Sequence, residues 1–417
     1  MDGLLIAIIG VIVLALVFDF TNGFHDAANS VATVVATRAL PARWAPWFSA
    51  VFNFSAFFVV GTAVANTVAK VVKHDAEGVA VVFAALIAAI TWNYLTWYVG
   101  MPSSSSHAII GGLVGAGLAA GGLAAINWGV VQTAVLAIVV SPAVAFTIAF
   151  LAMLVLARLE RRLRIHENAK GFKALQLVSA AAVSFGHGAN DAQKTMGIMA
   201  AALLAGGYLT LRPDGSLQID WWIPLLAYSA IALGTVWGGW KIIETMGLRI
   251  TTLRASSGFA ANVGAVTAIF GATGLGIPIS TTHAAASSIT GSGVASGQGV
   301  NVRVVLKMVA SWVITIPSTV VIGWAMFQLT QLPGAAAWVA VGSVLFVLIG
   351  WIAWAMAHAV HASDIAAEIP TEAELGEPVL AVPHIQGLSA LDLHPIDGLG
   401  QPAEHDLARV PEIRHPE

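Results

Sequence analysis

The chain contains no cysteine, which excludes disulfide bonds, thiolate chemistry and cysteine-ligated metal sites. Charged residues are scarce: they make up 10% of the 417 residues, whereas 58% are hydrophobic. No Gly-x-x-x-x-Gly-Lys-[Ser/Thr] motif occurs, so nothing indicates a P-loop nucleotide site. With a mean hydropathy of +0.82, the composition is that of a polytopic membrane protein rather than a soluble domain.

Apolar runs long enough to cross a membrane recur along the chain, since about 20 helical residues span the hydrocarbon core. We therefore predict an all-α membrane protein with about 10–12 membrane segments. The first run has no basic flank and no clear cleavage site, so we expect a retained span rather than a signal peptide. The runs are Leu4–Phe18, Trp47–Ala69, Val79–Val99, Trp128–Leu156, Trp221–Trp240, Met308–Leu329 and Ala336–Ala357.

Basic residues favour one side of the predicted membrane. Six of them share a short linker, which the positive-inside rule places in the cytoplasm. With the smaller basic clusters, this predicts the cell membrane, an outer amino terminus and a cytoplasmic carboxyl tail. The six are Arg158, Arg161, Arg162, Arg164, Lys170 and Lys173.

The carboxyl tail has the opposite charge. Residues 361–417 hold eleven of the 22 acids and two of the 19 basic residues, a net charge of −9. The tail is also rich in proline and poor in aromatics, which predicts a disordered segment, either simply solvated or regulatory.

Two polar segments each occur twice. Pro102-Ser-Ser-Ser-Ser-His107 and Pro278-Ile-Ser-Thr-Thr-His283 are offset by 176 residues, and the same offset superposes Gly115 on Gly291 and Gly117 on Gly293. The second pair is Gly23-Phe-His-Asp-Ala27 and Gly188-Ala-Asn-Asp-Ala192. Duplicated helix-breaking polar segments within apolar surroundings are typical of transporters built from inverted repeats, whose site lies where the repeats meet.

An odd number of predicted crossings separates the two Gly-x-x-Asp-Ala motifs, so the second repeat should be inverted. We expect a first repeat at 1–157, a basic linker at 158–172, a second repeat with the final span at 173–357, and the tail at 358–417. Whether the two proline segments cross fully or re-enter stays open.

The first motif places several polar residues in an otherwise apolar helix. Gly23, beside residues that compete for backbone hydrogen bonds, favours a helix break at this point. An intramembrane carboxylate such as Asp26 costs at least about 2.5 kcal/mol on insertion scales, so it requires a partner or a wet cavity. The alternative is that Asp26 merely lies at a helix end in the membrane interface. The polar residues are Asp19, Asn22, His25, Asp26, Asn29 and Ser30.

The second motif differs at one informative position. Lys194 aligns with Asn29 and follows Asp191 by three residues, so both side chains lie on the same helical face and can pair. The pair is either a structural salt bridge or a fixed positive charge in the transport pathway.

Pro102 and Pro278 each precede small hydroxyl residues, as expected for proline in the first turn of a helix. Free N–H groups, the positive end of the helix dipole and hydroxyl donors together make an anion site. Two such ends meeting at the midplane would hold a tetrahedral oxyanion; alternatively they are capping clusters. His107 and His283 are either ligands or core residues bonded to backbone carbonyls, and no zinc-type spacing accompanies them.

Other function classes fit less well. A channel needs no inverted pair of polar breaks. A membrane-embedded enzyme needs a nucleophile–base pair, which the spacing of Ser105 and His107 is too generic to indicate. A secondary anion carrier remains.

At these residues the chain resembles the inorganic phosphate transporter (PiT) family. The resemblance rests on Asp19–Ser30, Gly186–Lys194 and the two proline–hydroxyl–histidine segments, and it extends to about Ala357. It implies two inverted repeats, broken helices, homodimers in the lipid bilayer and symport of orthophosphate. His25 and Gln193-Lys194 replace the asparagine-rich motif of sodium-coupled members and resemble the low-affinity bacterial branch, which implies proton coupling and transport of metal–phosphate complexes.

We therefore predict phosphate import coupled to protons, with sodium coupling or sulfate transport as alternatives, and no cofactor, enzymatic activity, bound structural metal or nucleic-acid partner. The predicted substrate-binding residues are Asp26, Asn29, Ser104, Ser105, Ser106, Asp191, Lys194, Ser280, Thr281 and Thr282. The predicted coupling or gating residues are Asn22, His25, His107, His187, Asn190 and His283.

Overall fold

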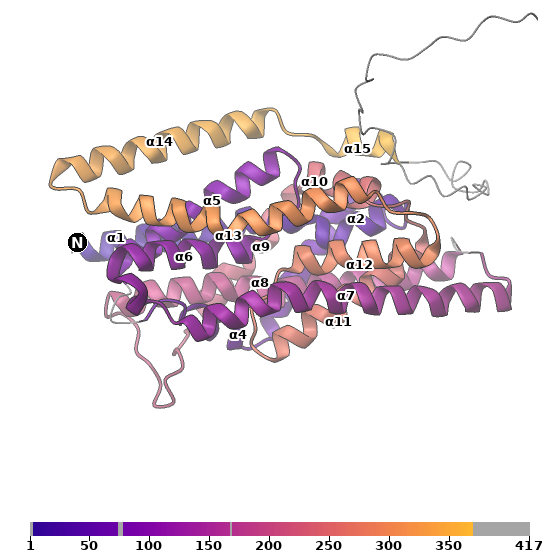
Figure 1. Cartoon of the computed structure of the whole chain (residues 1–417), viewed down its shortest axis with the longest axis horizontal. Coiled ribbons are helices and arrows are strands. Elements are labelled where there is room, and N and C mark those ends of the chain that lie inside the picture. The colour runs from indigo at the N-terminus through magenta and orange to yellow at the C-terminus, as the bar shows by residue number, and fades with distance from the viewer. Residues whose placement is uncertain (1–2, 74–77, 167–168, 370–417) are drawn as a thin grey trace, which may run out of the picture. The chain divides into compact units, whose positions relative to one another are not determined.

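The computed structural model describes residues 3–73, 78–166 and 169–369, all within one compact unit, Met1–His384 (Figure 1). Within these residues the secondary structure is helical and contains no strand, which confirms the all-α prediction. The helices are α1 (Gly3–Asp26), α2 (Ala28–Ala36), α3 (Ala45–Ser55), α4 (Ala63–Val68), α5 (Val79–Tyr98), α6 (Ser105–Gly121), α7 (Trp128–Leu163), α8 (Lys170–Ala205), α9 (Trp222–Trp237), α10 (Trp240–Glu244), α11 (Ala255–Gly274), α12 (Thr281–Ser296), α13 (Val302–Thr330), α14 (Ala335–Ala357) and α15 (Ala362–Glu368). Short 3₁₀ turns are η1 (Ala42–Trp44), η2 (Ala56–Phe58) and η3 (Gly122–Ala125), and η4 (Thr245–Arg249) is a π-helical turn.

Seven helical segments in the described part of the chain are long and apolar enough to cross a membrane. The pair formed by α9 with α10–η4, bent by 69°, makes an eighth. By length and composition this is fewer than the 10–12 segments predicted. Two helices account for part of the difference, because neither is counted as a span. The 36 residues of α8 carry the second polar motif in their middle, and α12 has only 16 residues.

The range Trp47–Ala69, predicted as one span, is divided into α3, η2 and α4. The helix ends before Val59-Val60-Gly61-Thr62, a run of β-branched residues and glycine with poor helix propensity. Hydropathy alone did not reveal this interruption, because valine is as apolar as leucine.

The predicted break near Gly23 is wrong: α1 continues to Asp26, and a single turn residue, Ala27, separates it from α2. Gly23 instead allows close helix packing, since a Cβ there would lie 2.2 Å from the carbonyl oxygen of Ile231 on α9. Small residues commonly bring membrane helices together in this way. The second motif is not a break either, because α8 is continuous through Gly188.

Each proline segment forms the turn between two packed helices, α5–α6 and α11–α12. The prolines lie two residues before the helix caps rather than in the first turn. The reason is that Ser104 and Ser280 cap the helices: their hydroxyls accept hydrogen bonds from the backbone N–H groups of His107 (3.2 Å) and His283 (3.1 Å). The first turn of each helix therefore begins with two hydroxyl residues.

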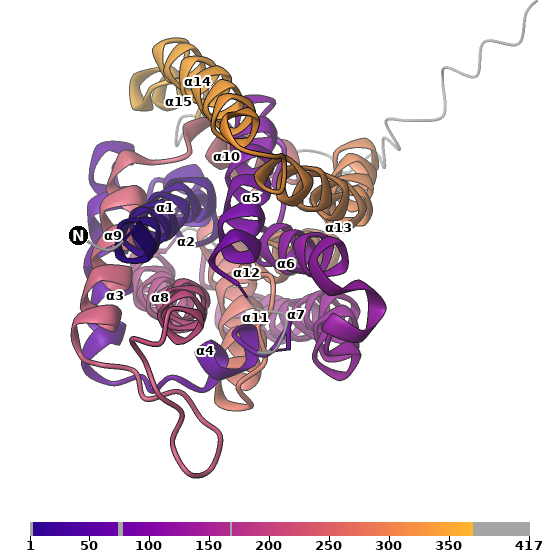
Figure 2. The same ribbon diagram turned by 90° about the vertical axis from the view of Figure 1, so that its left-hand side faces the viewer.

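The duplicated glycines of these hairpins contact long neighbouring helices. A Cβ on Gly115 of α6 would lie 2.0 Å from the Val320 carbonyl oxygen of α13, and a Cβ on Gly291 of α12 would lie 2.4 Å from the Phe146 carbonyl oxygen of α7. Both copies of the motif thus use the same packing device. Figure 2 shows α6 beside α13, and α11 and α12 beside α7.

The predicted basic linker is partly helical, because α7 extends to Leu163 and α8 begins at Lys170. The predicted disordered tail lies mainly in 370–417, outside the described residues. Its beginning forms the short helix α15, where Ile365 is buried and the backbone oxygen of Ile369 accepts a hydrogen bond from Arg38 at 2.7 Å.

We expect Gly115→Ala to destabilise the protein by about 1–3 kcal/mol, because the added methyl group overpacks the α6–α13 contact. The matched control is Gly10→Ala on α1, where nothing lies within 4 Å of the new Cβ. Thermal unfolding of the purified proteins in one detergent measures the difference. Equal midpoints for both variants would contradict the packing role.

Candidate functional site

The two duplicated aspartates lie together in the interior. His187 Nε2 lies 3.9 Å from Asp26 Oδ2 and 3.7 Å from Asp191 Oδ2. Asp26 is the last residue of α1, and Asp191 and His187 lie one turn apart on α8. Asp26 is only 2% exposed, so this helix end lies inside the protein rather than on its surface.

Both aspartates have a basic partner. His25 Nδ1 lies 2.7 Å from Asp26 Oδ1, and Lys194 Nζ lies 2.6 Å from Asp191 Oδ1. The other ring nitrogen of His25 lies 3.1 Å from the hydroxyl of Thr96 on α5. The predicted Asp191–Lys194 contact is present, and such partners offset the cost of burying charge.

The tip of the α5–α6 hairpin contacts the first motif. The Ser105 hydroxyl donates to Asn22 Oδ1 at 2.5 Å and lies 3.5 Å from Asp26 Oδ2. Asn22 in turn donates to Asp191 Oδ2 at 3.3 Å. One amide therefore connects this hairpin to carboxylates from both motifs.

The tip of the α11–α12 hairpin contacts the same carboxylates from another direction. The Thr281 hydroxyl donates to Asp26 Oδ2 at 3.3 Å. Asn29 of α2 donates to the hydroxyls of Thr281 (3.1 Å) and Thr282 (3.2 Å). Side chains about 250 residues apart in the sequence are thus direct neighbours.

Lys194 joins the two hairpin tips. Its ammonium donates to the Ser106 hydroxyl of α6 and, at 3.2 Å, to the carbonyl oxygen of Ile279, just before α12. Ser106 donates to the same carbonyl at 2.7 Å. A fully buried ammonium therefore lies between two helix N-termini and beside Asp191.

This arrangement offers one ligand both donors and acceptors. The ammonium, the hydroxyls and the two positive helix ends suit an anion. The carboxylates accept only, so they suit a protonated oxyanion or a cation. The site can therefore bind an anion together with a proton or metal ion.

Asp26, His187 and Asp191 could also hold a metal ion, since one ligand atom from each lies within 4.8 Å of the others. Carboxylate oxygen and imidazole nitrogen are ordinary ligands for divalent ions. The sequence spacing did not indicate this group, because two of its members are 165 residues apart.

Some predicted site residues support the site rather than face it. The hydroxyls of Ser104 and Ser280 are occupied as helix caps. Asn190 donates to the Thr273 hydroxyl (3.0 Å) and the Ile277 carbonyl (3.2 Å), and its Oδ1 accepts from the Ile279 N–H (3.3 Å). Asn190 therefore holds the α11–α12 hairpin in position.

His107 and His283 face each other, with ring centroids 4.6 Å apart, and His283 stacks on Trp312 at 4.0 Å. Within the described structure no hydrogen bond reaches their ring nitrogens. The described structure therefore does not show the predicted bonding to backbone carbonyls, and the role of the two histidines as ligands stays a prediction.

Sequence reasoning missed several polar neighbours of the site. Asn53 Oδ1 lies 3.1 Å from His187 Nδ1, and Ser103 shares a 2.8 Å hydrogen bond with Thr96. Asn53 and Thr96 each stand within an apolar run. A polar residue within a predicted apolar span was the sequence feature that could have identified these neighbours of the site.

A further series of buried polar contacts continues from the site along α2. The Thr33 hydroxyl donates to Asn262 Oδ1 at 3.0 Å, and Asn262 donates to the Ser179 hydroxyl at 3.1 Å. Nearer the end of α2, the Thr37 hydroxyl donates to Gln176 Oε1 at 2.8 Å. Polar groups therefore extend from Asn29 to the carboxyl end of α2.

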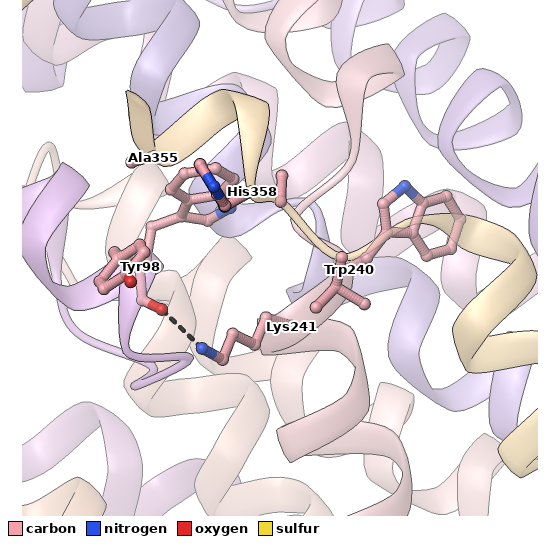
Figure 3. A pocket seen from close by; sticks show the side chains of 8 residues that line it. Tyr98, Trp240, Lys241, Ala355 and His358 are labelled. Atoms are coloured by element: carbon pink, nitrogen blue, oxygen red, sulfur yellow. Dashed lines mark hydrogen bonds between the residues drawn. The ribbon is translucent and has the colours of Figure 1, made fainter. Parts of the chain in front are cut away.

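A cavity of about 90 Å³ lies elsewhere, between the carboxyl ends of α5 and α14 and the start of α10 (Figure 3). Its cation, Lys241, donates to the Tyr98 carbonyl at 2.7 Å and lies over the Tyr98 ring. The cavity shares no lining residue with the carboxylate cluster, and its ammonium is already bonded. We therefore place the candidate site at the carboxylates.

The model of the phosphate transporter family matches residues 22–171 and 160–323, more than half of the chain. A solved structure described as "The sodium-dependent phosphate transporter" superposes with a TM-score of 0.70 at 28% identity, covering 79% of this chain and all of that one.

Curated relatives agree with the family match. A probable low-affinity inorganic phosphate transporter of Rhizobium meliloti is 46% identical over 318 residues, covering 76% of this chain and 94% of the relative. One of the same description from Bacillus subtilis is 42% identical over 331 residues, covering 78% of this chain and 97% of the relative. The chain belongs to the phosphate transporter family.

Proposed function

We propose that this protein imports inorganic phosphate by secondary active symport coupled to protons. Its family and curated relatives are transporters rather than enzymes, and the relatives are described as inorganic phosphate transporters. One observation carries the proposal: two hydroxyl-bearing helix N-termini, from α6 and α12, converge on Lys194 and two carboxylates. Helix ends and an ammonium are the groups that bind phosphate oxygens.

Proton coupling is favoured by Lys194. Phosphate and two aspartates would leave the site negative, and the buried ammonium supplies one compensating charge permanently. At the aligned position, Asn29 contributes only an amide. The solved relative is described as sodium-dependent, so sodium coupling is the alternative.

The proposal also includes a metal ion, a dimer and an orientation in the membrane. Asp26, His187 and Asp191 would hold the metal ion of a metal–phosphate complex. The protein would form a dimer in the cell membrane, with the amino terminus outside. On this orientation the polar series from Thr33 to Thr37 leads from the site toward the cytoplasm. The repeats at 1–157 and 173–357 would rock about the site and so open it alternately to the two sides of the membrane.

Removing the hydroxyls at the hairpin tips should weaken phosphate binding. Ser105→Ala and Thr281→Val each delete one donor to a charged ligand, at a cost of roughly 1.5–3 kcal/mol, about tenfold or more in affinity. We expect a raised half-saturation concentration for labelled phosphate uptake into proteoliposomes, at unchanged protein content. Ser292→Ala is the control, since within the described residues the one hydrogen bond of that buried hydroxyl goes to the Ile289 carbonyl of its own helix. Unchanged uptake in both tip variants would refute the anion site.

Selectivity over sulfate should depend on a carboxylate. Near neutral pH phosphate keeps a proton to donate, whereas sulfate has none, so an acceptor-only Asp26 favours phosphate. We expect Asp26→Asn to weaken phosphate uptake and to narrow the difference between phosphate and sulfate as competitors. Equal competition by sulfate in the wild-type protein would favour the sulfate-carrier alternative instead.

Lys194→Asn should impair proton-driven uptake. The measurement is phosphate accumulation in sodium-free proteoliposomes with an imposed proton gradient, with and without a protonophore. The wild type should accumulate phosphate until the protonophore is added, and a gain of sodium dependence in the variant would show that the ammonium occupies a cation site. An absolute sodium requirement in the wild type would contradict proton coupling.

A further inference from the structure

Asp19 is the one carboxylate in the described centre of the protein that lacks a partner. It lies on α1, fully buried at 0% exposure, and within the described structure no donor reaches either of its oxygens in full hydrogen-bond geometry, although the Thr195 hydroxyl and the Asn22 amide lie beside it. Asp26 is paired with His25, and Asp191 with Lys194. Asp19 has no role in the proposed binding of phosphate by Asp26, Asp191 and Lys194.

The groups around Asp19 come from three helices. Asn22 lies one turn further along α1, Asp191, Lys194 and Thr195 lie on α8, and Tyr228 lies on α9. Figure 2 shows α1, α8 and α9 as neighbours. Because Lys194 is bonded to Asp191, that pair is neutral overall and provides no net positive charge for a second carboxylate.

An ionised carboxylate without hydrogen bonds or a counter-ion is costly in a low-dielectric interior, and such a group takes up a proton instead. We propose that Asp19 is the residue that binds the coupling proton, an inference that rests on proton-coupled phosphate transport.

The surroundings also provide for release of the proton. The hydroxyls of Thr195 and Tyr228 have no hydrogen-bond partner within the described residues. The Thr195 hydroxyl lies close enough to donate to the carboxylate that is left when the Asp19 O–H bond breaks and its proton passes to water, and the Tyr228 hydroxyl would do so after a shift of α9. A small movement of α1 relative to α8 and α9 would thus exchange a buried neutral acid for a solvated or hydrogen-bonded carboxylate.

Asn22 connects this proton to the substrate site. It lies one turn from Asp19, donates to Asp191 and accepts from Ser105 at the α6 tip. A ligand that displaces the Ser105–Asn22 bond frees the Asn22 amide to reorient beside Asp19. Binding of phosphate and binding of the proton are therefore linked through one side chain.

The test compares two modes of the reconstituted full-length protein. Phosphate–phosphate exchange needs no net proton movement, whereas accumulation driven by a proton gradient does. Asp19→Asn mimics the permanently protonated acid, so we expect it to retain exchange and to lose accumulation at least tenfold. Asp19→Glu keeps a titratable group and should retain accumulation. Asp220→Asn, an exposed aspartate in the loop before α9, is the control.

A pH profile separates coupling from structural support. Exchange by the wild type should change with pH more than exchange by Asp19→Asn, and phosphate's own ionisation affects both equally. If Asp19→Asn cannot be purified in a folded form, the test uses Asp19→Glu instead. The pH profile of exchange by that variant should be displaced from the profile of the wild type. Wild-type accumulation in Asp19→Asn, or a profile of Asp19→Glu that coincides with the wild type, would overturn the role of Asp19. Absence of phosphate exchange in the wild type would instead overturn the proposed function.

Discussion

The contacts of one buried ammonium, that of Lys194, connect the parts of the site. The ammonium neutralises Asp191 on its own helix, donates to Ser106 at the tip of one hairpin and to the Ile279 carbonyl at the tip of the other. Removing one partner of a buried ion pair leaves an uncompensated charge, which costs about 3–5 kcal/mol. The positions of α8, α6 and the α11–α12 turn are therefore mutually dependent, and the candidate site forms where all three meet.

Two helices that begin inside the protein create this meeting point. The first turn of a helix has unpaired N–H groups, which require caps, water or a ligand when they are buried. Ser104 and Ser280 satisfy one N–H each, and the hydroxyls that follow them form hydrogen bonds with groups of the candidate site. Gly115 and Gly291 allow α6 and α12 to contact α13 and α7 closely enough to bury these ends. Packing by small residues thus determines where the groups proposed to bind the anion lie.

The sequence predicted what depends on local spacing or on duplication. The Asp191–Lys194 contact follows from a three-residue separation on a helix, and the paired proline segments indicated two similar hairpins. The role of Gly23 was not predictable in the same way, because a glycine among polar residues favours a break in isolation and close packing when α9 lies beside it. The Asn29–Thr281 contact and the metal-binding geometry at His187 depend on tertiary structure alone, since no local pattern relates those positions.

The site holds more acid than base, and this imbalance explains how transport can be coupled. Lys194 pairs with Asp191 and His25 is able to pair with Asp26, while Asp19 has no basic partner among the described residues. Adding a phosphate anion would increase the negative charge, so the proposed binding would be favoured by a cation that enters with it. A proton on a carboxylate meets this requirement without needing a preformed shell of oxygen ligands. If phosphate and a cation bind together, as proposed, each raises the binding affinity of the other by the same factor.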